Sequence, residues 1–296
     1  MWRRLDAYLV PAVSWGITGF QPSRGPYGVA MDSKIALVTG ASRGLGRGIA
    51  LGLGTAGWTV WVTGRSSRTS SRTSHLPGTV EETAEAVTAA GGRGIAAVCD
   101  HRDDEQVRAV VARIRSESRA LHLLVNNAWG GYERLNAGAW QEWNAPFWDQ
   151  PLDLWDAMFD GGVRAHYVTT ALCAGLLRAT TGSLVVTVSM EAGSRHQAGY
   201  GVAYSVAKAA DDRLALAVAT ALSADGVASV ALYPGLVRTE GVMQFAGHLD
   251  LTDSQSPEGV GRVVAALAAD DTAMSLTGHA LTVTDLAQRY RIDPTT

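Results

Sequence analysis

Short runs of apolar, mainly branched residues alternate along the chain with longer segments that mix polar and apolar positions. Runs that are apolar throughout are typical of strands buried on both faces of a parallel sheet. They predict seven strands, over residues 35–39, 58–63, 94–99, 121–126, 184–189, 228–233 and 280–284. The segments between them predict helices over residues 45–56, 79–90, 103–117, 152–177, 203–224 and 257–268, the longest with a place for a bend at Gly161–Gly162. Because strands and helices alternate, we expect an α/β fold with a doubly wound, parallel, seven-stranded sheet.

No internal repeat and no linker divides this pattern, so residues 31–296 are expected to form a single domain. Residues 1–30 do not follow the pattern. Their apolar positions are interrupted by Pro11 and Ser14, and no small-residue cleavage site follows. We interpret them as a disordered extension ahead of a domain that starts near Met31. An export signal is the alternative interpretation.

Composition and charge exclude several classes of protein. Of the 296 residues, 47% are hydrophobic and 18% are charged, which is ordinary for a globular protein. The net charge of −3 leaves no basic excess to neutralise a phosphate backbone, so no nucleic-acid partner is expected. No apolar run reaches the ~20 residues that span a bilayer, so no membrane span is expected. Cys99 and Cys173 have neither metal-ligand nor disulfide-framework spacing, so we expect no metal and a reducing compartment.

A glycine-rich turn joins the first predicted strand to the first predicted helix. Its glycines would let the backbone turn tightly and approach a pyrophosphate, while the helix N-terminus offers free N–H groups. The place of this turn at the start of a βαβ unit predicts the dinucleotide-binding end of a Rossmann fold. A purely structural turn is the alternative. The expected cofactor-binding positions here are Gly40, Ser42, Arg43, Gly44, Leu45 and Gly46.

The end of the second predicted strand indicates which dinucleotide binds. Enzymes that use NAD place an acidic residue there to bind the ribose hydroxyls, whereas this chain has Gly64 followed by Arg65. Arg43 in the glycine turn can face the same point. Two guanidinium groups and no carboxylate suit a 2′-phosphate. The sequence therefore predicts NADP(H) in preference to NAD(H), which stays possible; the alternative interpretation of Arg65 is a solvated loop cation.

Two further strand ends carry polar residues at the edge of the sheet where ligands bind in this architecture. Asp100 follows the third predicted strand and is placed to accept a hydrogen bond from an adenine amino group. Its alternative role is to cap the helix that starts near Asp103. Asn126 and Ala128 close the fourth strand in an Asn-Asn-Ala sequence and are expected to line the cofactor site.

Tyr204 and Lys208 are the candidate catalytic pair. Four residues apart on a helix, they share one face. A neighbouring ammonium favours the phenolate, and so lowers the pKa of the phenol. A tyrosine tuned in this way can give or take the proton of an alcohol/carbonyl pair. Ser189, at the end of the fifth strand, could hydrogen-bond the carbonyl oxygen; it could instead be a strand-end turn residue, and Ser194 is the alternative candidate.

Taken together, these motifs resemble the short-chain dehydrogenase/reductase family, in family order over residues 34–285. The resemblance implies that Tyr204 is the general acid/base and that Ser189 orients the substrate. It implies that Lys208 binds the nicotinamide ribose and lowers the pKa of the tyrosine. Assembly as a homodimer or homotetramer through the long helices is also implied. The residues implied to hold the nicotinamide end are Pro234, Gly235, Val237 and Thr239.

A second set of residues resembles one subgroup of this family, which is associated with NADPH-dependent reduction of carbonyls and broad substrate tolerance. The residues that carry this similarity are Thr63-Gly64-Arg65, Phe147-Trp148, Pro151, Trp155-Asp156, Arg164 and His166-Tyr167.

The chain departs from the family pattern at three places. Gly162 stands where the family usually has an asparagine, which is thought to help seat a water in the proton relay from the lysine. Trp129 follows the Asn-Asn-Ala sequence, where the family usually has glycine. The interval between Ser189 and Tyr204 is two residues longer than usual, which an insertion within 193–199 would absorb.

The substrate side is expected to be aromatic. Five tryptophans fall between residues 129 and 155, next to the reactive end of the cofactor, where they would form an apolar wall. Packing of a subunit interface or of a long loop is the alternative. A second lid is expected over residues 240–256. The candidate substrate contacts are Trp129, Trp148 and Phe245.

The expected function is therefore NADPH-dependent reduction of a bulky, apolar ketone or aldehyde, with a small-molecule carbonyl or alcohol as the only kind of partner besides further copies of the chain. A cytoplasmic location is expected because the cofactor pool is there. Two other interpretations stay open. One is an alcohol dehydrogenase that works in the oxidative direction, and the other is a catalytically weak NADP-binding sensor or scaffold, which Gly162 favours.

Overall fold

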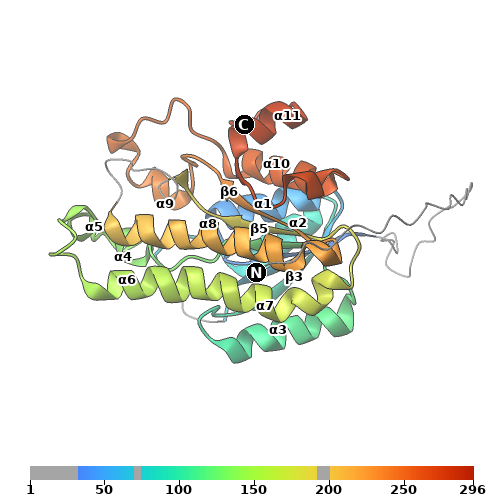
Figure 1. The fold of residues 1–296 in the computed structure, drawn as a ribbon. Coiled ribbons are helices and arrows are strands. Elements are labelled where there is room, and N and C mark those ends of the chain that lie inside the picture. The colour runs from blue at the N-terminus through green and yellow to red at the C-terminus, as the bar shows by residue number, and fades with distance from the viewer. Residues whose placement is uncertain (1–32, 70–74, 192–200) are drawn as a thin grey trace, which may run out of the picture. The chain divides into compact units, whose positions relative to one another are not determined.

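A computed structural model describes residues 33–69, 75–191 and 201–296 (Figure 1). Its strands form one parallel, seven-stranded sheet in the order β3-β2-β1-β4-β5-β6-β7. This order confirms the predicted doubly wound α/β sheet of the Rossmann type. The expected extension, residues 1–30, and Met31 lie outside the described residues. The strand bounds are β1 Ile35–Val38, β2 Thr59–Gly64, β3 Arg93–Val98, β4 Leu123–Asn126, β5 Leu184–Val188, β6 Ala228–Tyr233 and β7 Ala280–Thr282.

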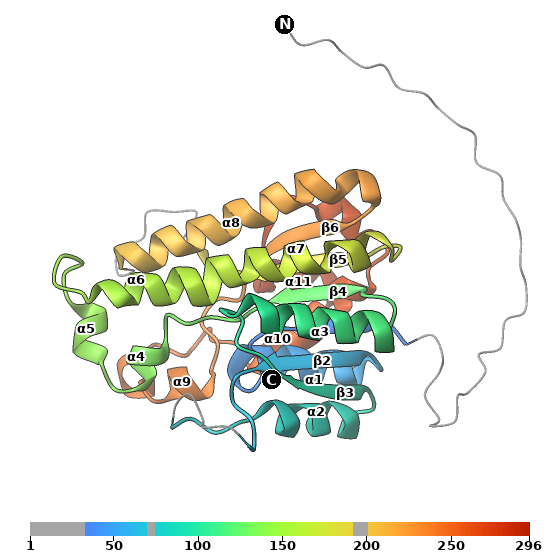
Figure 2. The same cartoon turned by 90° about the horizontal axis from the view of Figure 1, so that it is seen from below.

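Helices cover both faces of the sheet. In Figure 2, α3 (Asp104–Glu117), α7 (Ala165–Arg178) and α8 (Val202–Leu222) lie side by side in front of the strands. The opposite face carries α1 Gly44–Thr55, α2 Val80–Ala89, α10 Pro257–Ala269 and α11 Val283–Tyr290. Within the described ranges, no helix is both long and apolar enough to span a membrane.

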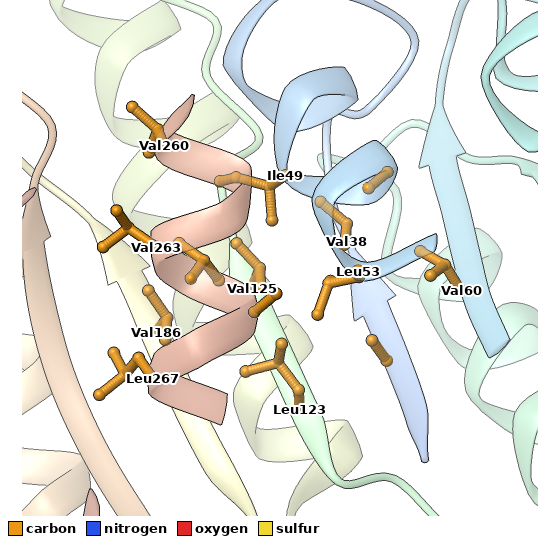
Figure 3. Close-up of a cluster of buried hydrophobic side chains, with 14 of the residues drawn as sticks. Val38, Ile49, Leu53, Val60, Leu123, Val125, Val186, Val260, Val263 and Leu267 are labelled. Atoms are coloured by element: carbon orange, nitrogen blue, oxygen red, sulfur yellow. The ribbon is translucent and has the colours of Figure 1, made fainter. Parts of the chain in front are cut away.

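Successive strand residues pack on opposite faces, because side chains alternate along a strand. On one face, Val38, Val125 and Val186 pack with residues of α1 and α10 (Figure 3). On the other, the neighbouring residues Leu37 and Leu124 pack with α3 and α7. Both sets are buried, which explains why the strands are apolar throughout rather than at every second position.

Short helices stand beyond one end of the sheet, as the left side of Figure 2 shows. They are α4 (Glu133–Asn136), α5 (Trp140–Asn144) and α9 (Glu240–Met243). The sequence pattern did not predict them, because each spans only about one turn and has no apolar period of its own. They come from the tryptophan-rich segment and from the segment after β6, the two places where a wall or lid was expected.

The long helix predicted over residues 152–177 is interrupted. It consists of α6 (Leu152–Met158), a π-helical turn (Phe159–Arg164) and α7. The two glycines at which a bend was expected, Gly161 and Gly162, lie within this π turn, a local widening that often occurs at functional sites.

The last strand is shorter than predicted, and the prediction missed α11. The strand ends at Thr282, whose hydroxyl accepts a hydrogen bond from the backbone N–H of Asp285 at 3.0 Å. This contact caps the N-terminus of α11, so the chain turns helical where the strand was expected to continue to residue 284.

Candidate active site

The carboxyl ends of β1, β4, β5 and β6 open into a cavity of about 750 Å³. This volume is within the range of small-molecule and cofactor sites. Most residues that the sequence singled out meet there. They are Gly40, Ser42, Arg43, Gly44, Leu45, Gly46, Arg65, Asp100, Ala128, Trp129, Ser189, Tyr204, Lys208, Pro234, Gly235, Val237, Thr239 and Phe245.

Two of the expected residues do not line this cavity. Asn126 is fully buried below it, where its side-chain N–H group donates to the hydroxyls of Thr170 (2.8 Å) and Thr187 (3.4 Å). It therefore ties β4 to α7 and β5. Trp148 is 72% exposed and packs edge-on against Phe147, which is also exposed. The structure thus corrects both assignments: these residues are a support and a surface residue.

The glycine turn is packed too tightly at Gly40 for a side chain. Gly40 has a positive φ of 63°, and a Cβ atom there would lie 2.8 Å from the Cα of Ala128. The side chain of Asn127 donates to the carbonyls of Thr39 and Gly40 at 2.8 and 3.1 Å. The turn after β1 is therefore fastened to the turn after β4, and its backbone faces the cavity.

A carboxylate stands at the N-terminus of α1. The backbone N–H of Gly44 donates to Oε2 of Glu240 at 2.9 Å. An anion is stabilised there by the free N–H groups and by the helix dipole. The first turn of α1 therefore binds a negatively charged group in this structure, as expected of a phosphate-binding helix end.

The two arginines expected at a 2′-phosphate both lie at the cavity but have protein partners. Arg65 forms an ion pair with Glu133 of α4 at 2.5 Å. The Arg43 guanidinium donates to the hydroxyl of Ser66 at 2.8 Å and to the carbonyls of Pro77 and Gly78. Glu133 was not predicted, because it lies 68 residues from Arg65 and follows a different strand.

Asp100 lines the cavity next to its own ion-pair partner, Arg102, at 2.6 Å. Burial alone would raise the pKa of Asp100, but hydrogen bonds from Arg102 and the charge of Arg65 hold the pKa below its usual value. The alternative role as a helix cap is wrong. Asp103 caps α3, since its carboxylate accepts from the backbone N–H groups of residues 105 and 106.

Tyr204 is almost buried within a group of aromatic rings. Its phenol oxygen accepts a hydrogen bond from the hydroxyl of Tyr132 at 2.9 Å. The rings of Trp129 and Trp143 meet the Tyr204 ring edge-on, with centroids 5.8 and 5.9 Å away. Aromatic rings therefore make up much of the described surroundings of the Tyr204 side chain.

Lys208 lies one turn further along α8, and its ammonium has both polar and aromatic neighbours. It donates to Oδ2 of Asp211 at 3.1 Å and to the Val188 carbonyl at 3.3 Å, and it lies 3.6 Å from the centroid of the Trp129 ring. The centroid of the Tyr204 ring is 6.0 Å away. The hydroxyl of Ser189 donates to the backbone carbonyl of Lys208 at 3.1 Å, so the end of β5 is fixed to α8. Both side chains face the cavity that Tyr204 lines.

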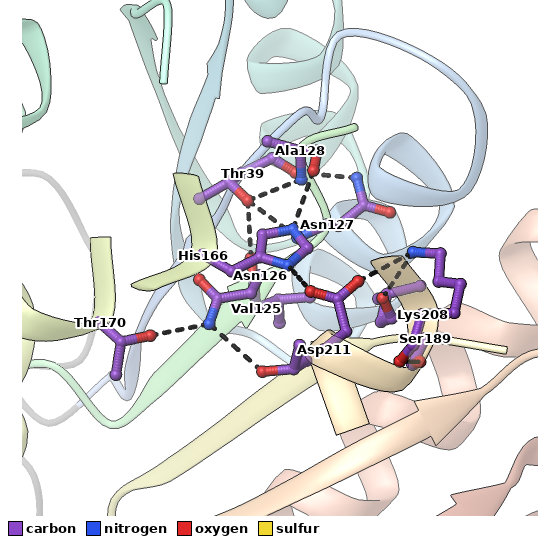
Figure 4. Close-up of polar contacts among 12 residues, drawn as sticks. Thr39, Val125, Asn126, Asn127, Ala128, His166, Thr170, Ser189, Lys208 and Asp211 are labelled. Atoms are coloured by element: carbon purple, nitrogen blue, oxygen red, sulfur yellow. Dashed lines mark hydrogen bonds and ion pairs between the residues drawn. The ribbon is translucent and has the colours of Figure 1, made fainter. Parts of the chain in front are cut away.

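A polar network connects the strand ends below the cavity, as Figure 4 shows. The hydroxyl of Thr39 accepts from the backbone N–H groups of Asn127 and Ala128 at 2.8 and 2.9 Å. His166 joins the carbonyl of Ala128 to the carboxylate of Asp211, with both contacts at 2.8 Å. The turn after β4 is thereby linked to α7 and α8.

Comparisons with known proteins agree with this geometry. The family described as short chain dehydrogenase matches residues 34–249. Dehydrogenase/reductase SDR family member 1 of Mus musculus is 37% identical, and its Homo sapiens counterpart is 34% identical; each alignment covers 88% of this chain and 82% of the relative. This chain is a member of the short-chain dehydrogenase/reductase family. These relatives also confirm the predicted subgroup, because they belong to the subgroup indicated by residues such as Thr63-Gly64-Arg65 and His166-Tyr167.

Solved structures support the same fold for this short-chain dehydrogenase/reductase. A short chain dehydrogenase of Mycobacterium thermoresistibile is 26% identical, with a TM-score of 0.71 over 88% of each chain. A 3-oxoacyl-[acyl-carrier protein] reductase of Brucella melitensis, solved in complex with NAD, has a TM-score of 0.71 at 22% identity, covering 85% of this chain and 96% of that one. The latter likeness concerns the fold alone.

The departures of this short-chain dehydrogenase/reductase from its family pattern can now be placed. Gly162 lies in the π turn directly against the Trp129 indole. The expected insertion within 193–199 and the alternative serine, Ser194, fall outside the described residues.

Two site residues escaped sequence reasoning. Tyr132 and Glu133 lie at the start of α4, and nothing in the local sequence indicates that they reach the cavity. Trp143 belongs to the expected aromatic wall and Glu240 to the expected lid, but their individual contacts were not predicted. Asp211 did leave a signal, because three residues after Lys208 on a helix puts it on the same face.

Proposed function

We propose that this protein is an NADPH-dependent carbonyl reductase that acts on bulky, apolar ketones or aldehydes. The observation that carries the proposal is the position of Tyr204 and Lys208: both face one cavity that also contains the glycine turn and a wall of aromatic rings. The cavity thus offers a proton donor, a cation and a phosphate-binding backbone within one space.

The residues present fit a nicotinamide dinucleotide. A Cβ atom on Gly46 would meet the Asn127 side chain at 2.4 Å, so the turn keeps its backbone bare where a pyrophosphate would approach. At the end of β2, Gly64 provides no side chain and Arg65 provides a guanidinium. Two arginines at this end support NADP(H) over NAD(H), because a guanidinium forms bidentate, charge-assisted hydrogen bonds with a phosphate.

In the proposed reaction, the bound nicotinamide supplies the hydride. Tyr204 donates its phenol proton to the carbonyl oxygen of the substrate, and the reverse transfer serves alcohol oxidation. Lys208 holds a positive charge near the phenol, which favours the phenolate. Ser189, whose hydroxyl donates to the Lys208 carbonyl in the structure, orients the carbonyl oxygen of the substrate by turning this hydroxyl to donate to it. Pro234, Gly235, Val237 and Thr239, which lie at the cavity beyond β6, hold the nicotinamide end.

The aromatic wall supports an apolar substrate. Trp140 of α5 stacks on Phe245, with ring centroids 4.6 Å apart, so the two expected lids meet each other. Trp129, Tyr132 and Trp143 continue this wall towards Tyr204. Because aromatic faces reward the burial of apolar groups, aryl ketones are expected to be reduced more efficiently than small hydrophilic carbonyls.

The sensor interpretation loses the feature that favoured it. Gly162 suggested a damaged site, but the structure gives the glycine a packing role against Trp129, while Tyr204, Lys208 and Ser189 all face the cavity. Alcohol oxidation stays a second proposal, because Tyr204 can donate the proton in reduction and accept it in oxidation. We also propose a cytoplasmic homodimer or homotetramer; exposed apolar residues on α7 and α8, among them Tyr167 and Val206, support such contacts.

Substitution of Tyr204 tests the proposed function. Tyr204→Phe should lower kcat for aryl-ketone reduction by about 100- to 10,000-fold while the affinity for NADPH, measured by tryptophan fluorescence, stays within a few-fold. Tyr132→Phe is the matched control, since it removes only the hydroxyl that donates to Tyr204, and it should cost far less. Wild-type protein that binds NADPH but reduces no carbonyl in a broad panel would reject the reductase and favour the sensor.

A further inference from the structure

The ammonium of Lys208 is held from below by a buried carboxylate. Asp211 has no exposed surface, and its Oδ2 accepts from Lys208 Nζ at 3.1 Å. Its other oxygen, Oδ1, contacts Nδ1 of His166 at 2.8 Å. Each carboxylate oxygen is thus bound by a cationic or polar group, so the carboxylate has a fixed position within the core (Figure 4).

His166 lies between two hydrogen-bond acceptors. Its Nε2 is 2.8 Å from the carbonyl oxygen of Ala128, which can only accept, so Nε2 carries a proton. The contact between Nδ1 and Asp211 needs a second proton. Burial alone would raise the pKa of Asp211, yet the charges of His166 and Lys208 outweigh it and lower that pKa. The carboxylate of Asp211 accepts at both oxygens, from the Lys208 ammonium at one and from the ring at the other, and this geometry assigns the second proton to Nδ1 of His166.

A second buried histidine nearby behaves differently. His101 contacts the hydroxyls of Thr63 and Thr169, at 2.8 and 3.1 Å, and neither partner is charged. Burial and the charge of His166 lower the pKa of His101 to about 4, so its ring is neutral. His166 thus differs from His101 in having a carboxylate partner rather than in being buried.

We propose that Asp211 and His166 are positioning residues for Lys208. Asp211 fixes the ammonium at the cavity floor, and the imidazolium of His166 locks Asp211 to the turn after β4. The three groups together carry one net positive charge, from two cations and one anion. This chain of groups takes over the support that the family pattern assigns to an asparagine at residue 162, where this protein has a glycine covered by Trp129.

The consequence concerns the proton of Tyr204. A net positive charge beside a phenol favours the phenolate, and it is screened little by solvent because Asp211 and His166 are buried. These side chains also connect three elements, since Ala128 follows β4, His166 lies on α7 and Asp211 lies on α8. This inference rests on the proposed role of Lys208 at the cofactor.

Nuclear magnetic resonance of the histidine rings tests the charge directly and needs no substrate. In wild-type protein at pH 7, proton–nitrogen correlations should show protons on both nitrogens of His166 and on one nitrogen of His101. His166→Gln assigns the signals, and His279→Gln, which changes an exposed histidine, is the control. In Asp211→Asn the His166 ring should lose one proton. A His166 ring with a single proton in the wild type would overturn the charge assignment.

Kinetics and binding test the positioning, with NADPH and acetophenone for reduction and with NADP⁺ and 1-phenylethanol for oxidation. Asp211→Asn should weaken NADPH binding and lower kcat/KM about ten- to a hundredfold, as expected for the loss of a charge-assisted contact. Asp225→Asn, which breaks an exposed ion pair with Arg178, should change neither. An Asp211→Asn protein within twofold of wild type in both would overturn the proposal.

The pH profile separates positioning from a merely structural role. Oxidation needs the phenolate, so its rate rises as the pH passes the pKa of Tyr204. His166→Gln removes one positive charge and should move this rise to higher pH, and an unmoved profile would contradict the proposal. If Asp211→Asn does not fold, the pH profile of His166→Gln and the histidine signals of the wild type still test the proposal. Wild-type protein that fails to bind NADPH would reject the proposed function instead. The histidine signals would still test whether Lys208, Asp211 and His166 are arranged as proposed.

Discussion

The indole of Trp129 occupies the space that any side chain at residue 162 would need. A Cβ atom on Gly162 would lie 2.6 Å from two carbons of the indole ring. The family usually combines an asparagine at residue 162 with a glycine at residue 129. The tryptophan at residue 129 and the glycine at residue 162 are therefore coupled. The large side chain of Trp129 fits only because residue 162 has none.

This relationship predicts a non-additive pair of substitutions. Gly162→Ala should lower the free energy of unfolding by roughly 1–3 kcal/mol, because it overpacks a filled space. The double variant Trp129→Gly/Gly162→Ala should be more stable than the sum of the single changes predicts, by roughly 0.5–3 kcal/mol for residues in contact. Urea denaturation of the four proteins measures the coupling.

Gly175→Ala is the matched control for this cycle. Gly175 also lies on the helical stretch around α7, but a Cβ atom there would meet only the end of the Arg115 side chain, at 3.9 Å. It should leave stability unchanged or raise it, since alanine is the better helix former. Additive effects within the Trp129/Gly162 cycle would show that the close approach does not constrain residue 162.

Arg65 and its partner Glu133 predict the cofactor preference. If Arg65 binds a 2′-phosphate, Arg65→Ala should raise the KM for NADPH about ten- to a hundredfold and leave the KM for NADH nearly unchanged. Glu133→Gln should lower the KM for NADPH, because it removes the carboxylate that competes for the guanidinium. Arg68→Ala, which breaks an exposed ion pair with Glu85, is the control. Equal effects of Arg65→Ala on both cofactors would reject the role.

Glu240 predicts an effect that does not distinguish the cofactors. Its carboxylate accepts from the backbone N–H of Gly44 at the start of α1, where a pyrophosphate would bind. Glu240→Gln should therefore tighten the binding of NADPH and NADH alike, by about two- to fivefold for a charge at a helix end. Isothermal titration measures both. Glu258→Gln, at the start of α10, is the control, and a change confined to one cofactor would contradict the competition.

Local sequence patterns predicted the sheet because most strands are mainly apolar and are bounded by turn residues. They failed where a contact decides the structure. Thr282 ends β7 by capping α11, and residues 159–164 form a π turn that no periodicity indicates. In the candidate site, too, local motifs were predicted and contacts between distant segments were not.

Motifs within one segment, such as Tyr204 with Lys208, could be read directly from the sequence. Partners from distant segments could not. Glu133 reaches Arg65 from a segment 68 residues away, and His166 reaches Asp211 from 45 residues away. Only the folded chain brings these side chains together, so no local sequence pattern indicates that they pair.

His101 predicts how stability changes with pH. Its pKa falls from 6.5 to about 4 in the folded protein, mainly through burial and also through the charge of His166. Between these two values the unfolded chain binds more protons at this residue than the folded chain does, so stability falls as the pH falls. The contribution is fully present above about pH 6.5 and amounts to roughly 2–3 kcal/mol once lost near pH 4. Urea denaturation at pH 7, 6 and 5 should show this loss in the wild type, and His101→Gln should remove the part that comes from this residue. A variant whose stability falls as steeply as that of the wild type would show that another group carries the pH dependence.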